Sequence, residues 1–192
     1  MKKIYKGNPG YLKSRKIKLG IGVCAGILLI VAIYAAGYII FDTPKNYVTI
    51  LAVLAVLPVA KILIQYLMVP WKNNADISEY EQLKKDIEPL PLYCEFMITA
   101  QEKRFPILYL VIDKNENIIA FTKNEKADCQ AFEKGVVNFL NYYDLNSKVK
   151  LYTDLKQFTK KAVQLARQNA EITDSQKEHI LYIYEKISIM SV

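Results

Sequence analysis

Two long apolar runs fill most of the first 71 residues. Residues 19–41 contain no charged side chain, and residues 46–71 contain only Lys61. At a rise of about 1.5 Å per residue, either run makes a helix of roughly 34 Å or more, long enough to cross the hydrocarbon core of a bilayer. The polar break at 42–46 contains Pro44, which cannot continue a helix. The pattern predicts a transmembrane hairpin with spans at about 19–41 and 47–71.

Two features inside these spans are candidates for contacts between helices. Gly22 and Gly26 form a GxxxG pattern, which lets helix backbones approach closely, either within the hairpin or between two copies of the chain. Lys61 and Gln65 are four residues apart and therefore share one helix face. Neither span contains an acidic residue. Lys61 therefore either extends toward the membrane surface, with Gln65 as its polar neighbour, or meets an acidic group of another protein or of a lipid.

After residue 71 the pattern changes to short alternating and periodic runs. Residues 72–75 form a linker, and residues 76–192 are expected to form one domain. Leu92, Cys94, Phe96 and Ile98 alternate with other positions and predict a strand that buries one face. The expected elements are a helix over about 76–88, strands at 92–99, 106–112 and 117–122, a helix from 128, a strand at 148–152, and helices that start near 153 and 174.

This order, α-β-β-β-α-β-α-α, predicts a small α+β domain with helices packed on a mostly antiparallel four-stranded sheet. The whole chain is thus expected to be a membrane protein with an N-terminal hairpin and a cytoplasmic domain. Its 192 residues leave room for one domain and a small accessory part.

Charge gives the expected orientation in the membrane. Seven of the 26 basic residues lie within residues 1–18, which contain no acidic residue, and the rest of the chain carries 19 basic and 19 acidic residues. Basic flanks stay inside, so we expect a multi-pass cell-membrane protein with both termini cytoplasmic. The basic arm at 1–18 is expected to contact anionic lipids of the inner leaflet. No nucleic-acid partner is expected, because the folded part carries no excess positive charge.

The predicted domain is poor in the residue types that carry catalysis. His179 is its one histidine and lacks the spacing of a metal ligand, and Cys94 and Cys129 lack zinc-site spacing. Gly135 is its one glycine and stands inside a predicted helix, so no phosphate-binding loop is expected. It is expected to mark a close contact between helix and sheet. We therefore expect no cofactor and no enzyme activity.

The first six elements, α-β-β-β-α-β, resemble in their order the core of the restriction-endonuclease-like fold. That fold carries metal-binding acids on its second and third strands, with a lysine two positions after one of them. Here Asp113 ends the second predicted strand, but the third has no acid, and Phe121 stands two positions before Lys123. The resemblance covers no motif and implies a degenerate site, with Asp113 as the candidate metal ligand. An enzyme that used carboxylates alone would bind a divalent cation through Asp113 and through Glu95 or Glu116.

The hypothesis that follows is a non-catalytic, membrane-anchored interaction or scaffold module. Besides the lipid bilayer, its expected partner is another membrane protein or a second copy of the chain. Two alternatives stay open: a metal-dependent enzyme that uses carboxylates alone, and a subunit of an oligomeric transporter.

Overall fold

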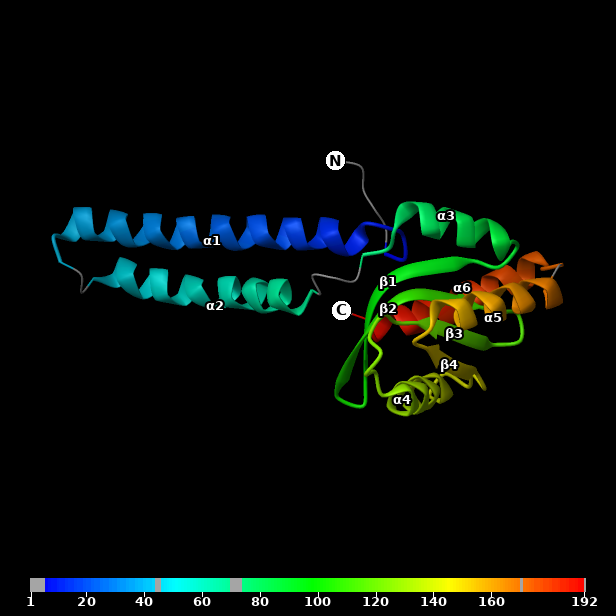
Figure 1. Ribbon diagram of the computed structural model, residues 1–192. Coiled ribbons are helices and arrows are strands. Elements are labelled where there is room, and N and C mark those ends of the chain that lie inside the picture. Colours follow the sequence, from blue (N-terminus) through cyan, green and yellow to red (C-terminus); the bar gives the residue numbers. More distant parts are fainter. Residues whose placement is uncertain (1–5, 44–45, 70–73, 170, 192) are drawn as a thin grey trace. The chain divides into compact units, whose positions relative to one another are not determined.

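The computed structural model describes residues 6–43, 46–69, 74–169 and 171–191, and the chain divides into two compact units (Figure 1). Residues 13–69 form one unit, and residues up to 12 together with residues from 70 onward form the other. The predicted loop residues Pro44 and Lys45, the end of the second predicted span at 70–71 and linker residues 72–73 lie outside the described residues.

The first unit is a hairpin of two long helices, α1 (Tyr11–Phe41) and α2 (Tyr47–Met68). Asn46 caps α2: its Oδ1 accepts the amide of Thr49 at 2.9 Å, and its Nδ2 donates to the carbonyl of Gly37 at 3.0 Å. A side chain that binds both helices at the turn fixes where α1 stops and α2 starts.

Both helices are long and apolar enough to cross a membrane. Their large apolar side chains are mostly exposed, as with Leu28 at 69% and Ile39 at 76%. A core helix of a soluble protein would bury such side chains, so the hairpin is compatible with insertion into a bilayer.

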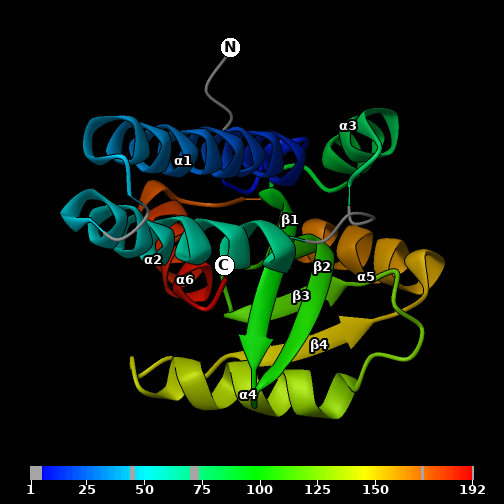
Figure 2. The same cartoon turned by 90° about the vertical axis from the view of Figure 1, so that its left-hand side faces the viewer.

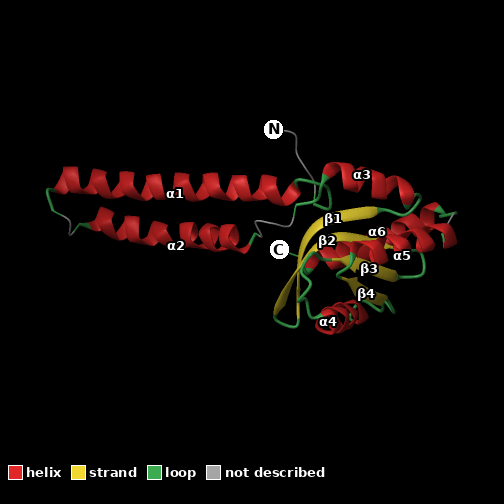
Figure 3. Cartoon of the chain, in the orientation of Figure 1, coloured by secondary structure: helices red, strands yellow, loops and turns green. Residues whose placement is uncertain are grey.

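The second unit is a small α+β domain whose eight elements follow the predicted order (Figure 3). They are α3 (Ile77–Asp86), β1 (Leu92–Ala100), β2 (Lys103–Ile112), β3 (Asn117–Phe121), α4 (Cys129–Asn141), β4 (Lys148–Tyr152), α5 (Leu155–Gln168) and α6 (Asp174–Ile189).

The four strands form one mixed sheet in the order β1-β2-β3-β4. β1 pairs with β2 and β2 with β3 in antiparallel register, whereas β4 lies parallel to β3. The parallel pair arises because α4 connects β3 to β4, and a helical crossover returns the chain in the same direction. The predicted four strands are confirmed, and the parallel β4 makes the sheet mixed.

Helices cover both faces of the sheet. α4 and α6 pack on one face, with Phe132, Val136 and Ile183 in its core, and α3 and α5 pack on the other, with Leu83 and Phe158 in that core. Figure 2 shows α4 running along β4. A Cβ at Gly135 of α4 would lie 2.7 Å from the Cβ of Ala100 on β1, which confirms the predicted close contact of helix and sheet.

The first strand does not bury a single face as its alternation predicts. Leu92 and Cys94 belong to the core under α3 and α5, whereas Phe96 and Ile98 belong to the core under α4 and α6. The switch occurs at Glu95, which has a φ of 60° and is absent from the regular β1–β2 ladder. Because a residue with positive φ reverses the side-chain direction, the strand serves both cores in turn.

Short segments from both ends of the chain cover the outer edge of β1. The amide of Cys94 donates to the carbonyl of Gly7 at 3.0 Å, and the amide of Thr99 donates to the carbonyl of Met190 at 3.0 Å. Exposed strand edges invite pairing with other chains, so these segments protect the sheet. The structure therefore assigns Lys6–Leu12 to the domain and starts α1 at Tyr11, inside the predicted 1–18 arm.

Candidate functional site

Glu95 is a buried carboxylate that binds three backbone amides. It is 1% exposed, in the middle of β1. Its Oε1 accepts the amides of Gly10 at 2.8 Å and Ala75 at 3.1 Å, and its Oε2 accepts the amide of Leu12 at 3.0 Å. The amides supply the hydrogen bonds that a carboxylate needs once it leaves water.

The three amides come from the two segments that connect the domain to the hairpin. Gly10 and Leu12 stand where the chain enters α1, whose first free amides and positive dipole end suit a carboxylate. Ala75 stands just before α3, on the return from α2. One carboxylate of β1 thus holds both chain connections of the hairpin. We call Glu95 and these three amides the Glu95 clamp.

A second set of contacts fastens the incoming segment to α6. The ammonium of Lys6 donates to the carbonyls of Ser188 at 2.7 Å and Ser191 at 2.9 Å. A cation is stabilised there because carbonyls at a helix C-terminus carry partial negative charge. In return, the hydroxyl of Tyr184 donates to the carbonyl of Lys6 at 2.8 Å. Lys6, which the sequence places in the basic arm, thus binds carbonyls of the domain.

Asp113 shapes the turn between β2 and β3. It is 1% exposed. Its Oδ1 accepts the amides of Asn115 and Asn117, each at 2.8 Å, and its Oδ2 accepts the side-chain amide of Asn117 at 2.7 Å. An aspartate that binds amides two and four residues ahead stabilises a tight turn. Both oxygens of this candidate metal ligand therefore already have donors.

The other candidate ligands are dispersed. The Glu116 carboxylate lies 2.9 Å from Nε2 of His179, and Glu95 is held in the clamp. Burial raises the pKa of the Cys94 thiol, and the nearby Glu95 carboxylate adds to this shift, so the thiol stays protonated. Within the described part of the chain, no group of three His, Cys, Asp or Glu side chains is placed to hold a metal ion.

Inside the hairpin, the two glycines of the GxxxG pattern face α2. A Cβ at Gly26 would lie 2.6 Å from a methyl of Val59, and one at Gly22 would lie 3.6 Å from a methyl of Ile62. Lys61 is exposed and Gln65 half-buried on α2. Among the hairpin residues that the structure describes, Lys61 has neither a hydrogen bond nor an ion pair.

Searches of protein-family models, of curated proteins and of solved structures find no match to this chain.

Proposed function

We propose that this chain is a membrane-anchored, non-catalytic interaction module with both termini in the cytoplasm. The observation that carries the proposal is the Glu95 clamp, which fastens both connections of the hairpin to one strand of the domain. A buried carboxylate whose oxygens are all occupied by backbone amides serves the fold and not catalysis, which favours a module that acts by binding.

The use of the acidic side chains supports a binding role over a catalytic one. Asp113 organises a turn, Glu95 holds the clamp and Glu116 lies beside His179. A carboxylate enzyme needs at least two such groups converging on one metal ion or one substrate atom. These three acids instead satisfy separate structural needs.

Lys61 is the residue that we propose for partner recognition. It is exposed on α2, and neither span contains an acidic residue that could pair with its ammonium. A lysine inside a bilayer is stabilised by an opposite charge, so the partner is expected to be another membrane protein with an acidic residue in a span. Gln65, one turn further along α2, would add a hydrogen bond to the same contact.

The test is crosslinking in native membranes, followed by affinity recovery of the tagged full chain and identification of what is recovered with it. Wild type and Lys61→Arg should recover one reproducible membrane protein. Lys61→Leu should insert normally and recover less of it. Leu63→Ala, on the same helix, is the matched control and should behave as wild type.

Equal recovery by Lys61→Leu and wild type would refute the role of Lys61. Recovery of nothing beyond the chain itself, at crosslinker levels that capture known membrane complexes, would refute the interaction module. Crosslinked multiples of this chain alone would instead favour the oligomeric transporter.

A further inference from the structure

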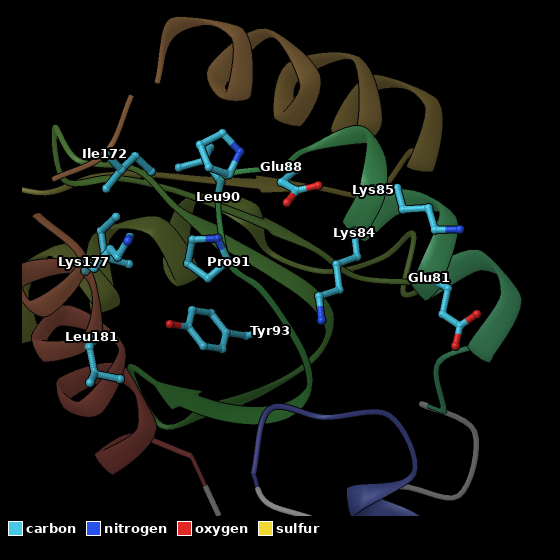
Figure 4. Close-up of a pocket in the computed structure, with 12 residues that line it drawn as sticks. Glu81, Lys84, Lys85, Glu88, Leu90, Pro91, Tyr93, Ile172, Lys177 and Leu181 are labelled. Carbon is cyan, nitrogen blue, oxygen red and sulfur yellow. The ribbon is translucent and has the colours of Figure 1, made fainter. Parts of the chain in front are cut away.

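The domain has a groove between α3 and α6 that takes part in neither the clamp nor the hairpin. Its volume is about 650 Å³, within the usual range for small-molecule sites of roughly 300–1,000 Å³. We call it the α3–α6 groove (Figure 4). Its apolar lining comes from the 89–91 segment, from Tyr93 of β1 and from the start of α6, with Leu90, Pro91, Ile172, Ile180 and Leu181 contributing.

An apolar wall of this groove is open to solvent. Leu181 of α6 is 49% exposed, and Ile172, which precedes α6, is half-buried. The ring of Tyr93 lies at the base, stacked on Tyr184 at 4.0 Å between ring centroids. Stacked aromatic rings form a rigid surface, so this base is preformed for an apolar ligand.

Three hydrogen-bond donors surround that apolar base. Figure 4 shows Lys84 reaching from α3 toward the level of Tyr93 on one side, and Lys177 reaching from α6 on the other. The hydroxyl of Tyr93 points to the α6 side and has no hydrogen-bond partner among the described residues. Burial, together with the neighbouring Tyr184, raises the pKa of Tyr93 to about 12, so it remains a donor at neutral pH.

The acidic groups of the groove lie away from this position. Glu81 stands at the outer end near Lys85, and Glu88 stands between Leu90 and Lys84, farther from Tyr93 than the Lys84 ammonium in this view (Figure 4). Lys177 pairs with Asp174 at 2.9 Å, but that carboxylate is 96% exposed. An exposed pair of this kind is weak and can be shared with a ligand. The lining thus carries three lysines against two glutamates, and Lys84 and Lys177 are the charged side chains labelled nearest to Tyr93 (Figure 4).

We propose that the α3–α6 groove binds a single-chain acidic amphiphile, a molecule with an apolar chain and one carboxylate or phosphate group. The apolar chain lies along Leu90, Pro91 and Leu181. The anionic group lies beside the hydroxyl of Tyr93, between the ammonium groups of Lys84 and Lys177. Glu81 at the outer end and Glu88 beside Leu90 exclude the acidic group from those two positions, which leaves it at Tyr93.

The proposal goes beyond the interaction module and does not depend on it, because the hairpin contributes no residue to the groove. The test uses the full chain in nanodiscs of phosphatidylcholine, with equilibrium dialysis of octanoate and of octyl phosphate against empty nanodiscs. Octanol, with the same chain and no charge, is the matched ligand control. Saturable binding of the two acids that exceeds binding of octanol is the expected result.

Two variants locate the binding. Lys84→Gln with Lys177→Gln removes both ammonium groups and should weaken octanoate binding about tenfold or more, the effect of losing about 1.4 kcal/mol. Leu181→Arg places a charge in the path of the apolar chain and should abolish saturable binding of octanoate. The variant should still fold, because Leu181 is half exposed. Lys156→Gln with Lys160→Gln removes the same charge from α5 and should leave binding unchanged.

Thermal unfolding of each variant, measured in the same nanodiscs, shows whether it is folded. Equal binding of octanol and octanoate would overturn the proposal, because the ammonium groups would then play no part. Unchanged octanoate binding in the folded Lys84 and Lys177 double variant would overturn it as well, as would the absence of saturable binding by wild type.

Discussion

Replacing Glu95 tests how strongly one carboxylate fastens the hairpin connections to the domain. Glu95→Ala removes the acceptor of three amides at 2.8, 3.0 and 3.1 Å. Glu95→Gln keeps the size and one oxygen of the side chain. Its carbonyl oxygen can take the place of Oε1 and keep the amides of Gly10 and Ala75. Its NH₂ group then faces the amide of Leu12, a donor against a donor.

The magnitudes follow from the burial of each bond. The bond to Leu12 is buried, so its loss leaves an unsatisfied amide and costs about 2–3 kcal/mol. The bonds to Gly10 and Ala75 are only part-buried, and water can replace the acceptor there at about 1 kcal/mol each. We expect Glu95→Ala to lower the free energy of unfolding by about 4–5 kcal/mol, and Glu95→Gln by about half as much.

The assay is urea unfolding of the full chain in detergent micelles, combined with hydrogen exchange of individual amides. In Glu95→Gln, the amide of Leu12 should lose protection while those of Gly10 and Ala75 keep it. Thr99→Ala, an exposed position of the same strand, is the control and should change the stability by less than about 0.5 kcal/mol. If Glu95→Gln were as unstable as Glu95→Ala, or if Leu12 stayed protected, the assignment of the two carboxylate oxygens would be wrong.

Three further substitutions test other parts of the structure. Asp113→Ala should lower the free energy of unfolding by about 2–3 kcal/mol. Mg²⁺ or Mn²⁺ should not raise the melting temperature of wild type. If either ion did so, and the variant lost the effect, Asp113 would be a metal ligand. Gly26→Ala should destabilise the hairpin by about 1–3 kcal/mol in thermal unfolding, whereas Gly22→Ala, with a methyl contact of 3.6 Å, should be neutral; equal effects would contradict the packing. A hydrogen bond from Lys103 lowers the pKa of Asp128. Wild type should therefore be more stable than Asp128→Asn above about pH 4, and this difference in stability should vanish as the pH falls below that value. A difference that persists in acid would contradict the ion pair.

Local signals in the sequence predict most of the domain's elements. Asp128 and Asp154 cap α4 and α5, which confirms the helix starts that the sequence places at 128 and near 153. The second strand begins at Lys103, before the predicted 106, because it continues through a tight turn at Gln101 and Glu102. Both turn residues have positive φ, at 48° and 63°. Such turns normally carry glycine or asparagine, so this sequence gives no signal for a hairpin there.

The candidate site was only partly predictable, because its role depends on contacts between distant segments. Asp113 binds Asn117 four residues ahead, which is a local contact, but Glu116 lies beside His179, 63 residues away, and only the fold brings these two together. From the sequence alone, Lys6 is one of the seven basic residues of the N-terminal arm. Its actual contacts are carbonyls at the far end of the chain, at Ser188 and Ser191. Composition and periodicity carry no information about such pairings.

The reversal of β1 at Glu95 links the fold to the proposed attachment of the hairpin. A regular strand would direct the side chain of residue 95 toward one of the two apolar cores, where a carboxylate without donors is costly. The positive φ of Glu95 costs about 1 kcal/mol or more. It lets Cys94 and Phe96 serve opposite cores while the carboxylate reaches the amides of Gly10, Leu12 and Ala75. The strained residue and the clamp are therefore one feature: the backbone conformation that breaks the alternation of β1 also places a charge where the chain leaves the domain.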